Sequence, residues 1–163
     1  CVEVPFGGSV GRFLRDCSGL DGVSAIQVGG PLGSVFRVDE LDDVELSFEG
    51  LAKAGGLLGH GGFVCYGDDF SPRDEVLHWM DFFAAESCGK CTPCRIGTQR
   101  ARELLRRIGS GDERAGDREL LGDLDEVMSG TSLCALGGLA MNPVRSTMQK
   151  WPDAFAANRE ERT

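Results

Sequence analysis

Three cysteines in one short stretch constrain this chain more than any other feature. Cys88, Cys91 and Cys94 have the spacing C-x-x-C-x-x-C. This spacing lets one tight loop supply three thiolates to an iron–sulfur cluster, and a [4Fe–4S] cluster takes four. Cys134 lies 40 residues beyond Cys94, far enough for a helix out, a turn and a helix back. The pattern therefore predicts that Cys88, Cys91, Cys94 and Cys134 hold a [4Fe–4S] cluster.

Two other uses of these cysteines are less well matched to the pattern. A structural zinc site usually draws two C-x-x-C pairs from separate places, whereas the division here is three and one. A disulfide framework is disfavoured because seven cysteines is an odd number and 163 residues can bury a core without cross-links. Structural zinc held by the same four cysteines stays open as the alternative.

The residues between and beside these cysteines fit a cluster loop. Gly89 and Pro93 are typical of tight loops, since glycine accepts positive φ and proline sets a turn. Lys90 and Arg95 would place positive charge near a cluster whose thiolates make it negative. Charge near a cluster tunes its reduction potential, so neither residue is needed as a ligand.

Composition narrows the possible locations and partners of the protein. The chain has 41% hydrophobic residues and no apolar run long enough to span a bilayer, which predicts a soluble chain without direct membrane insertion. A net charge of −9 argues against a nucleic-acid partner, because phosphate binding needs a basic surface. Thiolates that await a cluster need a reducing compartment, so a cytoplasmic location is expected. A histidine in a glycine-rich loop, such as His60, and one on a helix that bears Trp and Met, such as His78, are more often structural than catalytic, and we assign no catalytic residue.

The first part of the chain predicts a small α+β domain over residues 1–67. Short apolar runs predict strands at 2–4, 24–28, 35–38, 44–48 and 62–66. Ser9 can cap a helix whose apolar stripe includes Val10, Leu14 and Cys17, which makes Cys17 a core residue. One helix across a mixed sheet suggests a β-grasp arrangement. The glycine-rich stretch 55–62 has no nucleotide-binding motif and is expected to be a loop.

The second part, residues 72–160, predicts a four-helix bundle. Helices are expected over 72–87 after Ser71, from Arg95, from a cap at Asp117 to Gly130, and from Asn142 onward. Alternating antiparallel helices place both cysteine-bearing connections at the same end. The arginines of the second helix are expected to form a solvated or partner-facing side: Arg100, Arg102, Arg106 and Arg107.

Two motifs carry a resemblance to a known family. The stretch 86–97, which begins Glu-Ser-Cys-Gly-Lys-Cys, and the stretch 132–137, Ser-Leu-Cys-Ala-Leu-Gly, resemble the signature of NADH-oxidising flavoprotein subunits. That family includes the flavoprotein subunit of respiratory complex I, the diaphorase subunits of NAD-reducing hydrogenases and the beta subunits of NAD-dependent formate dehydrogenases. The resemblance covers essentially the whole chain, as the family's soluble-ligand-binding β-grasp domain followed by its iron–sulfur helical bundle. Residues 59–62, 88–91 and 143–153 look closest to formate dehydrogenase beta subunits.

The resemblance also implies a function and partners. Family members carry a preceding Rossmann-like domain that binds FMN and NADH, and nothing in this chain matches it. The implied role is an electron-transfer module that relays single electrons between that flavin and further clusters. Implied partners are the FMN- and NADH-binding domain or chain, a [2Fe–2S] thioredoxin-like subunit and a larger catalytic iron–sulfur subunit, which contains molybdenum in formate dehydrogenases. The alternative to an electron-transfer function is a binding function. In that case the β-grasp domain would bind a ligand, the cysteines would hold structural zinc, and the chain would have no redox activity.

Overall fold

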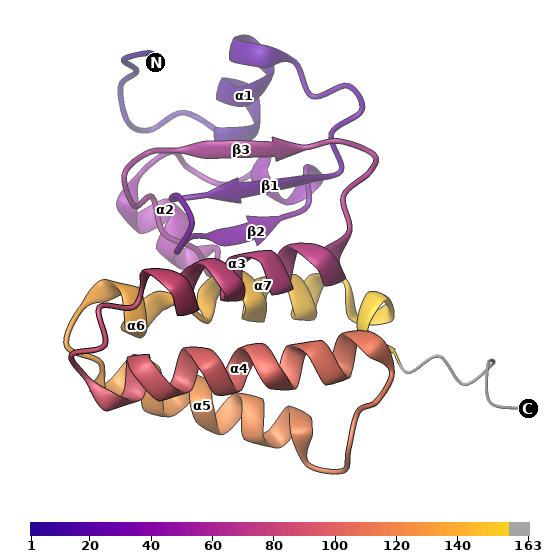
Figure 1. Ribbon diagram of the computed structural model, residues 1–163. Coiled ribbons are helices and arrows are strands. Elements are labelled where there is room, and N and C mark those ends of the chain that lie inside the picture. The colour runs from indigo at the N-terminus through magenta and orange to yellow at the C-terminus, as the bar shows by residue number, and fades with distance from the viewer. Residues whose placement is uncertain (157–163) are drawn as a thin grey trace, which may run out of the picture. The chain divides into compact units, whose positions relative to one another are not determined.

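The computed structural model describes residues 1–156, which divide between two compact units, residues 1–70 and residues 71 onward (Figure 1). The first unit contains a small sheet, and the second contains the long helices. The predicted α+β class is therefore confirmed.

The first unit is built on a three-stranded antiparallel sheet with the order β2-β1-β3 (Figure 1). The strands are β1 (Ala25–Val28), β2 (Ser34–Phe36) and β3 (Phe63–Tyr66). Ile26 of the central strand lies opposite Phe36 on one side and Cys65 on the other. All four residues of β1 are buried, which suits a central strand that contains the β-branched residues Ile26 and Val28.

Two serine-capped helices and a short 3-10 turn complete the first unit. In α1 (Val10–Ser18) the Ser9 hydroxyl accepts the Arg12 N–H at 3.2 Å, and in α2 (Phe48–Lys53) the Ser47 hydroxyl accepts the Gly50 N–H at 2.9 Å. The turn is η1 (Asp39–Leu41). These elements and the sheet bury one apolar cluster, which includes Val10, Leu14, Ile26, Val28, Phe36, Leu41 and Leu51.

Three predictions for this unit are wrong. Residues 2–4 lie in the described chain but form no strand, and Val2 and Val4 are exposed. Residues 44–48 contribute only an isolated bridge between Ser9 and Glu45, because Ser47 ends the extended stretch by capping α2. The sheet is antiparallel rather than mixed, and two helices rather than one accompany it.

The predicted core position of Cys17 is also wrong. Cys17 is exposed, although Val10 and Leu14 on the same stripe of α1 are buried. A helical period predicts which face turns inward, but it does not predict where along the helix the core ends. Cys17 lies in the last turn of α1, beyond that point.

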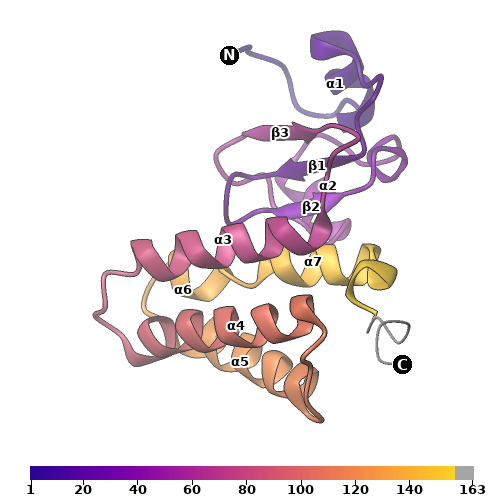
Figure 2. The same ribbon diagram turned by 45° about the vertical axis from the view of Figure 1, so that its right-hand side comes forward.

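The second unit is helical. Its elements are α3 (Pro72–Glu86), α4 (Thr92–Ser110), α5 (Asp117–Thr131), α6 (Ala135–Leu139), α7 (Asn142–Lys150) and the 3-10 turn η2 (Pro152–Phe155). Helix α3 packs against α4 and α7, and α4 also packs against α5 (Figure 2). The Ser71 hydroxyl accepts the Asp74 N–H at 3.4 Å, so the predicted start of the first helix is confirmed.

The apolar faces of these helices were predicted with mixed success. The predicted faces of α3 and α4 are buried, including Phe83 and Leu105. On α5, Leu121 and Met128 are buried, but Leu120 and Val127 are 48% and 50% exposed. The apolar stripe of α5 is wider than the surface that α4 covers.

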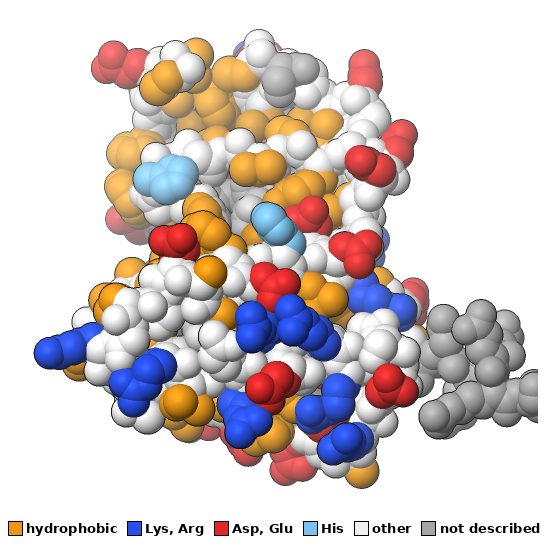
Figure 3. Space-filling view, viewed as in Figure 1, with side chains coloured by type: hydrophobic (Ala, Val, Ile, Leu, Met, Phe, Trp, Pro, Cys, Tyr) orange, Lys and Arg blue, Asp and Glu red, His pale blue; other side chains and the backbone are white. Residues whose placement is uncertain are grey.

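Ion pairs within the unit engage the arginines of α4. Figure 3 shows basic and acidic side chains interspersed on this face rather than a uniformly basic surface. Asp81 of α3 lies 2.8 Å from Arg106 and 3.6 Å from Arg102, and Arg107 pairs with Asp117 at 2.6 Å. Arg102, Arg106 and Arg107 therefore link α4 to neighbouring helices, which the expectation of a solvated or partner-facing side did not include. No helix in the described part of the chain is both long and apolar enough to cross a membrane.

Candidate metal centre

The connection from α3 to α4 and the connection from α5 to α6 meet at one end of the helices (Figure 1). The first carries Cys88 and Cys91 and leads directly into Cys94, and the second carries Cys134. The backbone N–H of Leu133 faces Cys91 Sγ, and the charges of Cys88, Cys91 and Cys134 all act on Cys94. The structure thus brings the four predicted site cysteines together.

Local interactions shape the first of these connections. Gly89 has φ +75°, a conformation that glycine adopts without strain, and its carbonyl accepts Arg95 Nη1–H at 2.6 Å. The predicted loop role of Gly89 is confirmed. Helix α4 begins at Thr92 rather than at Arg95, because Pro93 suits a first helical turn. Cys94 therefore lies inside the helix, while Lys90 is exposed.

Cys94 is the buried member of the set, at 4% exposed. The Ser87 hydroxyl lies 3.3 Å from Cys94 Sγ and accepts the Gly89 N–H at 3.4 Å, so its own hydrogen is available to the sulfur. Burial raises the pKa of Cys94, the Ser87 hydroxyl opposes this, and negative charge on the three other thiols raises the pKa further. The thiol therefore favours its neutral form until a positive metal centre compensates the charge.

The pKa of Cys91 shifts in the opposite direction. The backbone N–H groups of Leu133 and Cys94 face its sulfur and lower the pKa of the thiol. Cys91 is also the N-cap residue of α4, where the positive end of the helix dipole favours a thiolate. Both connections thus act on the Cys91 sulfur and favour its thiolate form.

The backbone of Gly137, in α6 beyond the second connection, lies close to Cys94. A Cβ at Gly137 would lie 2.4 Å from Ser132 Oγ and 2.8 Å from Cys94 Cβ, so only glycine fits there. This contact brings the start of α6 against the base of the Cys94 side chain. Of the other thiols in the set, Cys88 and Cys134 are exposed.

The donor set fits an iron–sulfur cluster. Among the described residues, no three cysteine, histidine, aspartate or glutamate side chains form a ready site for one metal ion. A [4Fe–4S] cluster is larger than one ion and takes its four thiolates at separate corners. Cys94, the three thiols whose charges act on it and the backbone N–H groups that face Cys91 Sγ would supply the ligands and hydrogen bonds that such a cluster uses.

Other cysteines and histidines do not join this set. Cys1, Cys17 and Cys65 belong to the first unit and are exposed. His60 packs against the backbone of two glycines, since a Cβ at Gly30 or Gly62 would lie within 2.3 Å of its ring. This packing agrees with the structural role expected for His60.

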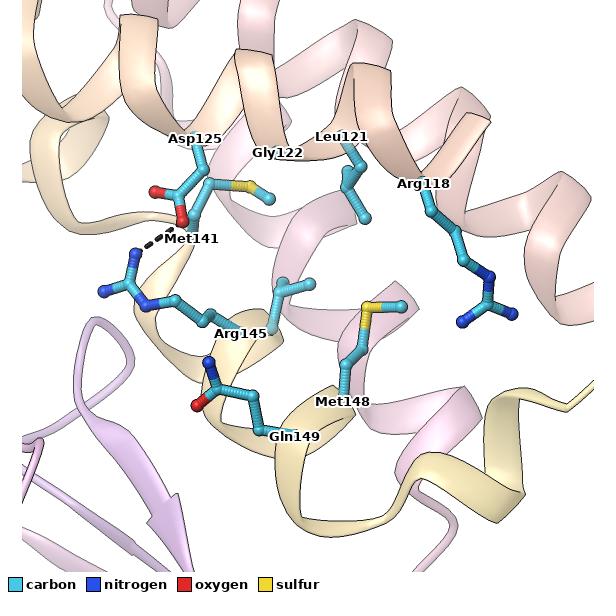
Figure 4. Close-up of a pocket in the computed structure, with 9 residues that line it drawn as sticks. Arg118, Leu121, Gly122, Asp125, Met141, Arg145, Met148 and Gln149 are labelled. Atoms are coloured by element: carbon cyan, nitrogen blue, oxygen red, sulfur yellow. Dashed lines mark hydrogen bonds and ion pairs between the residues drawn. The ribbon is translucent and has the colours of Figure 1, made fainter. Parts of the chain in front are cut away.

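A groove of about 280 Å³ between α5 and α7 is a second concave feature of the helical unit (Figure 4). Apolar side chains that include Leu121, Met141 and Met148 line it, and an Arg145–Asp125 ion pair of 2.5 Å lies at its edge. The lining residues include no cysteine, histidine or hydroxyl group that could act as a nucleophile. We assign this groove no chemistry.

Sequence reasoning missed two hydroxyls and one glycine at the cysteine site. Ser87 and Ser132 lie one and two residues before Cys88 and Cys134, and that adjacency is the only signal the sequence carries. The role of Gly137 depends on the approach of two segments that are distant in sequence, so spacing alone could not reveal it.

Comparison with known proteins gives one family. Residues 74–158, just over half of the chain, match the NADH-ubiquinone oxidoreductase-F iron-sulfur binding region. The NADP-reducing hydrogenase subunit HndC of Solidesulfovibrio fructosivorans is 36% identical, over 99% of this chain and 34% of that protein. An NADH-quinone oxidoreductase subunit of Streptomyces coelicolor is 34% identical, over 94% of this chain and 34% of that protein.

A solved structure supports the same relationship. The NAD⁺-reducing [NiFe]-hydrogenase in its H₂-reduced state matches with a TM-score of 0.81 and 32% identity, over 93% of this chain and 26% of that chain. The present chain spans about a third of the length of the curated relatives named above. All four site cysteines fall within the matched residues 74–158, and the chain belongs to the family of the NADH-ubiquinone oxidoreductase-F iron–sulfur binding region, a family with a [4Fe–4S] cluster.

Proposed function

We propose that the helical unit is an electron-transfer module whose [4Fe–4S] cluster is held by Cys88, Cys91, Cys94 and Cys134. The observation that carries the proposal is the meeting of two distant connections, in which the Leu133 N–H faces Cys91 Sγ and Gly137 packs on Cys94. A cluster bound there supplies one-electron oxidation and reduction. No other feature in the described part of the helical unit gathers groups of matching chemistry.

The residues of this chain would act on that site in distinct ways. The four thiolates hold the metal centre, and the Leu133 and Cys94 N–H groups stabilise its negative charge. Ser87 orients Cys94 through the contact of 3.3 Å. Lys90 is exposed beside the site, where positive charge favours the more negative, reduced state.

The names of the relatives support a proposal for the path of electrons beyond this chain. We propose that FMN and NAD bind to a domain or chain other than this one, and that the module passes electrons between that flavin and further clusters. Proposed partners are a [2Fe–2S] thioredoxin-like subunit and a larger catalytic iron–sulfur subunit. The names of the relatives, hydrogenase and quinone oxidoreductase subunits, favour these complexes, and the formate dehydrogenase assignment stays a prediction.

Exposed apolar side chains beside the cysteines support a partner surface at this end of the unit. Leu133 is 74% exposed and Ile96 is 48% exposed, and each lies within two residues of a proposed ligand. We propose that these two side chains belong to a surface that docks a partner, since exposed apolar surface of sufficient extent marks interaction sites. A reducing, cytoplasmic compartment would keep the exposed thiols Cys88 and Cys134 available for cluster assembly.

We also propose the finer fold assignments. The sheet and two helices of the first unit would form a soluble-ligand-binding β-grasp domain over residues 1–67. The longer helices α3, α4, α5 and α7 would form a four-helix bundle over residues 72–160, of which residues 157–160 lie outside the described chain.

Redox titration of the anaerobically purified chain tests the proposed function. The expected result is broad visible absorption that bleaches on reduction, with uptake of about one electron per chain and a paramagnetic reduced state. A colourless chain with one bound zinc and no redox response would overturn the proposal in favour of a structural metal site.

A further inference from the structure

The Ser132 hydroxyl has no hydrogen-bond partner among the described residues, although its oxygen is buried. A buried hydroxyl without a partner is unusual, because the loss of its hydrogen bond to water costs free energy. Only two other described side-chain atoms share this state, Arg102 Nε and Thr147 Oγ1. Of the three, Ser132 alone lies within two residues of a proposed ligand, Cys134.

Backbone hydrogen bonding and close packing fix the position of Ser132 Oγ. Ser132 ends α5, where its own N–H donates to Met128 O at 3.1 Å. Its Oγ lies 2.4 Å from the position that a Cβ on Gly137 would occupy, and that position lies 2.8 Å from Cys94 Cβ. The hydroxyl therefore lies beside the base of the Cys94 side chain, at the junction of the two cysteine connections.

Two neighbouring features of the site leave the hydroxyl without a partner. Cys134 is the N-cap of α6 and makes no side-chain cap, and the Ser132 hydroxyl makes no hydrogen bond to the first turn of that helix. Cys94 Sγ already has the Ser87 hydroxyl as its hydrogen-bond partner, at 3.3 Å. The unsatisfied donor is thus left for an acceptor that enters the site, and sulfur is the acceptor that a cluster brings.

We infer that the Ser132 hydroxyl donates a hydrogen bond to a sulfur of the bound cluster and thereby raises its reduction potential. This inference depends on the proposed function, because it needs a cluster at the four cysteines. Reduction adds negative charge to the cluster, so a donor to sulfur stabilises the reduced state more than the oxidised state. Ser132 would tune the cluster without being a ligand.

Electron paramagnetic resonance titration of the full chain in four forms tests this inference. The forms are the unsubstituted chain, Ser132→Ala, Ser132→Thr and Ser129→Ala. Ser129 is a matched control on the same helix, because its hydroxyl donates to Glu126 O at 3.1 Å on an exposed surface. Ser132→Thr keeps a hydroxyl at the position.

The expected result is a lower potential in Ser132→Ala alone. At a fixed applied potential its ratio of reduced to oxidised cluster should fall about tenfold, which corresponds to about 59 mV for one electron. Ser129→Ala should match the unsubstituted chain, and Ser132→Thr should restore most of the shift. Equal potentials in Ser132→Ala and the unsubstituted chain, with equal iron content, would overturn the inference.

A second measurement covers the case in which Ser132→Ala assembles no cluster. Chains grown on serine labelled with ¹³C at Cβ and on unlabelled cysteine should show, beside the coupling from Ser87, a further electron–nuclear coupling to the reduced cluster that Ser132→Thr loses and Ser129→Ala keeps. An unchanged spectrum in Ser132→Thr would overturn the inference. Absence of a cluster from the unsubstituted chain would instead contradict the proposed function, so the two failures are distinguishable.

Discussion

The Arg107–Asp117 pair joins two helices through two hydrogen bonds between one guanidinium and one carboxylate. Arg107 Nε and Nη2 donate to the two carboxylate oxygens of Asp117 at 2.9 and 2.6 Å, and the Arg114 N–H donates to the same carboxylate at 3.0 Å. Asp117 is 5% exposed, and these donors lower its pKa to about 2. The pair ties the end of α4 to the start of α5.

The lowered pKa of Asp117 predicts how this pair responds to acid. A carboxyl group with a lowered pKa stabilises the fold above its ordinary pKa of about 4 and loses that contribution as the pH falls toward 2. Asp117→Asn should therefore lower the free energy of unfolding at pH 7, and its difference from the unsubstituted chain should shrink as the pH falls below about 4 and vanish only below about pH 2. Urea denaturation followed by circular dichroism at a series of pH values measures this.

Glu103→Gln is the control for the Asp117 prediction. Glu103 pairs with Arg100 within α4, and both side chains are about half exposed. An exposed pair three residues apart on a helix contributes about 0.5 kcal/mol or less. If Asp117→Asn changed the free energy of unfolding no more than Glu103→Gln at pH 7, the structural importance of the Arg107–Asp117 pair would be refuted.

At the scale of elements, the packing of α4 on α5 depends on one small residue. Gly97 of α4 is buried, and a Cβ there would lie 2.5 Å from Met128 Sδ and 2.6 Å from Met128 Cγ. Met128 is 1% exposed, so its thioether has little room to move. The glycine lets the two helices approach closely near the cysteine end.

Substitution of Gly97 by alanine should therefore destabilise the helical unit. Overpacking of this kind costs about 1–3 kcal/mol. Gly122→Ala on α5 is the matched control, because nothing lies within 4 Å of its Cβ position, and it should stabilise the unit by about 0.5–1 kcal/mol. Thermal or chemical denaturation of both variants measures the difference, and a stabilised Gly97→Ala chain would contradict this description of the packing.

The helices with strong local signals were the elements that the sequence predicted best. Ser9 and Ser71 cap helices where expected, and the buried faces of α3 and α4 follow the helical period. The short helices α2 and α6 were missed, because six and five residues are too few to display a period. The approach of Leu133 to Cys91 could not be predicted in detail, because it depends on how α5 and α6 pack against α4.

At the scale of the whole molecule, the cluster would cross-link segments that are distant in sequence. The three-cysteine connection and Cys134 are separated by α4 and α5, so a bound cluster closes a loop that contains both helices. Closing that loop removes entropy from the unfolded chain, and metal binding to the folded state adds its own free energy. We therefore expect the cluster and the helical unit to be stable together.

Hydrogen exchange on the chain with and without its cluster tests this coupling. Cluster removal should selectively reduce protection between residues 86 and 136, because the two connections then lose their shared anchor. The first unit should keep its protection, since it has a core of its own around Ile26 and Phe36. Equal protection in both forms would mean that the cluster does not stabilise the fold.

Iron and acid-labile sulfide per chain in a series of cysteine variants test the central claim most directly. Four iron and four sulfide are expected in the unsubstituted chain and in the control variants Cys17→Ser and Cys65→Ser, whose thiols lie in the first unit. Cys134→Ala should fall below four iron, because it removes the one ligand that the second connection supplies. Full iron and sulfide in Cys134→Ala, or their loss in Cys17→Ser with the fold intact, would contradict the assignment of the four ligands.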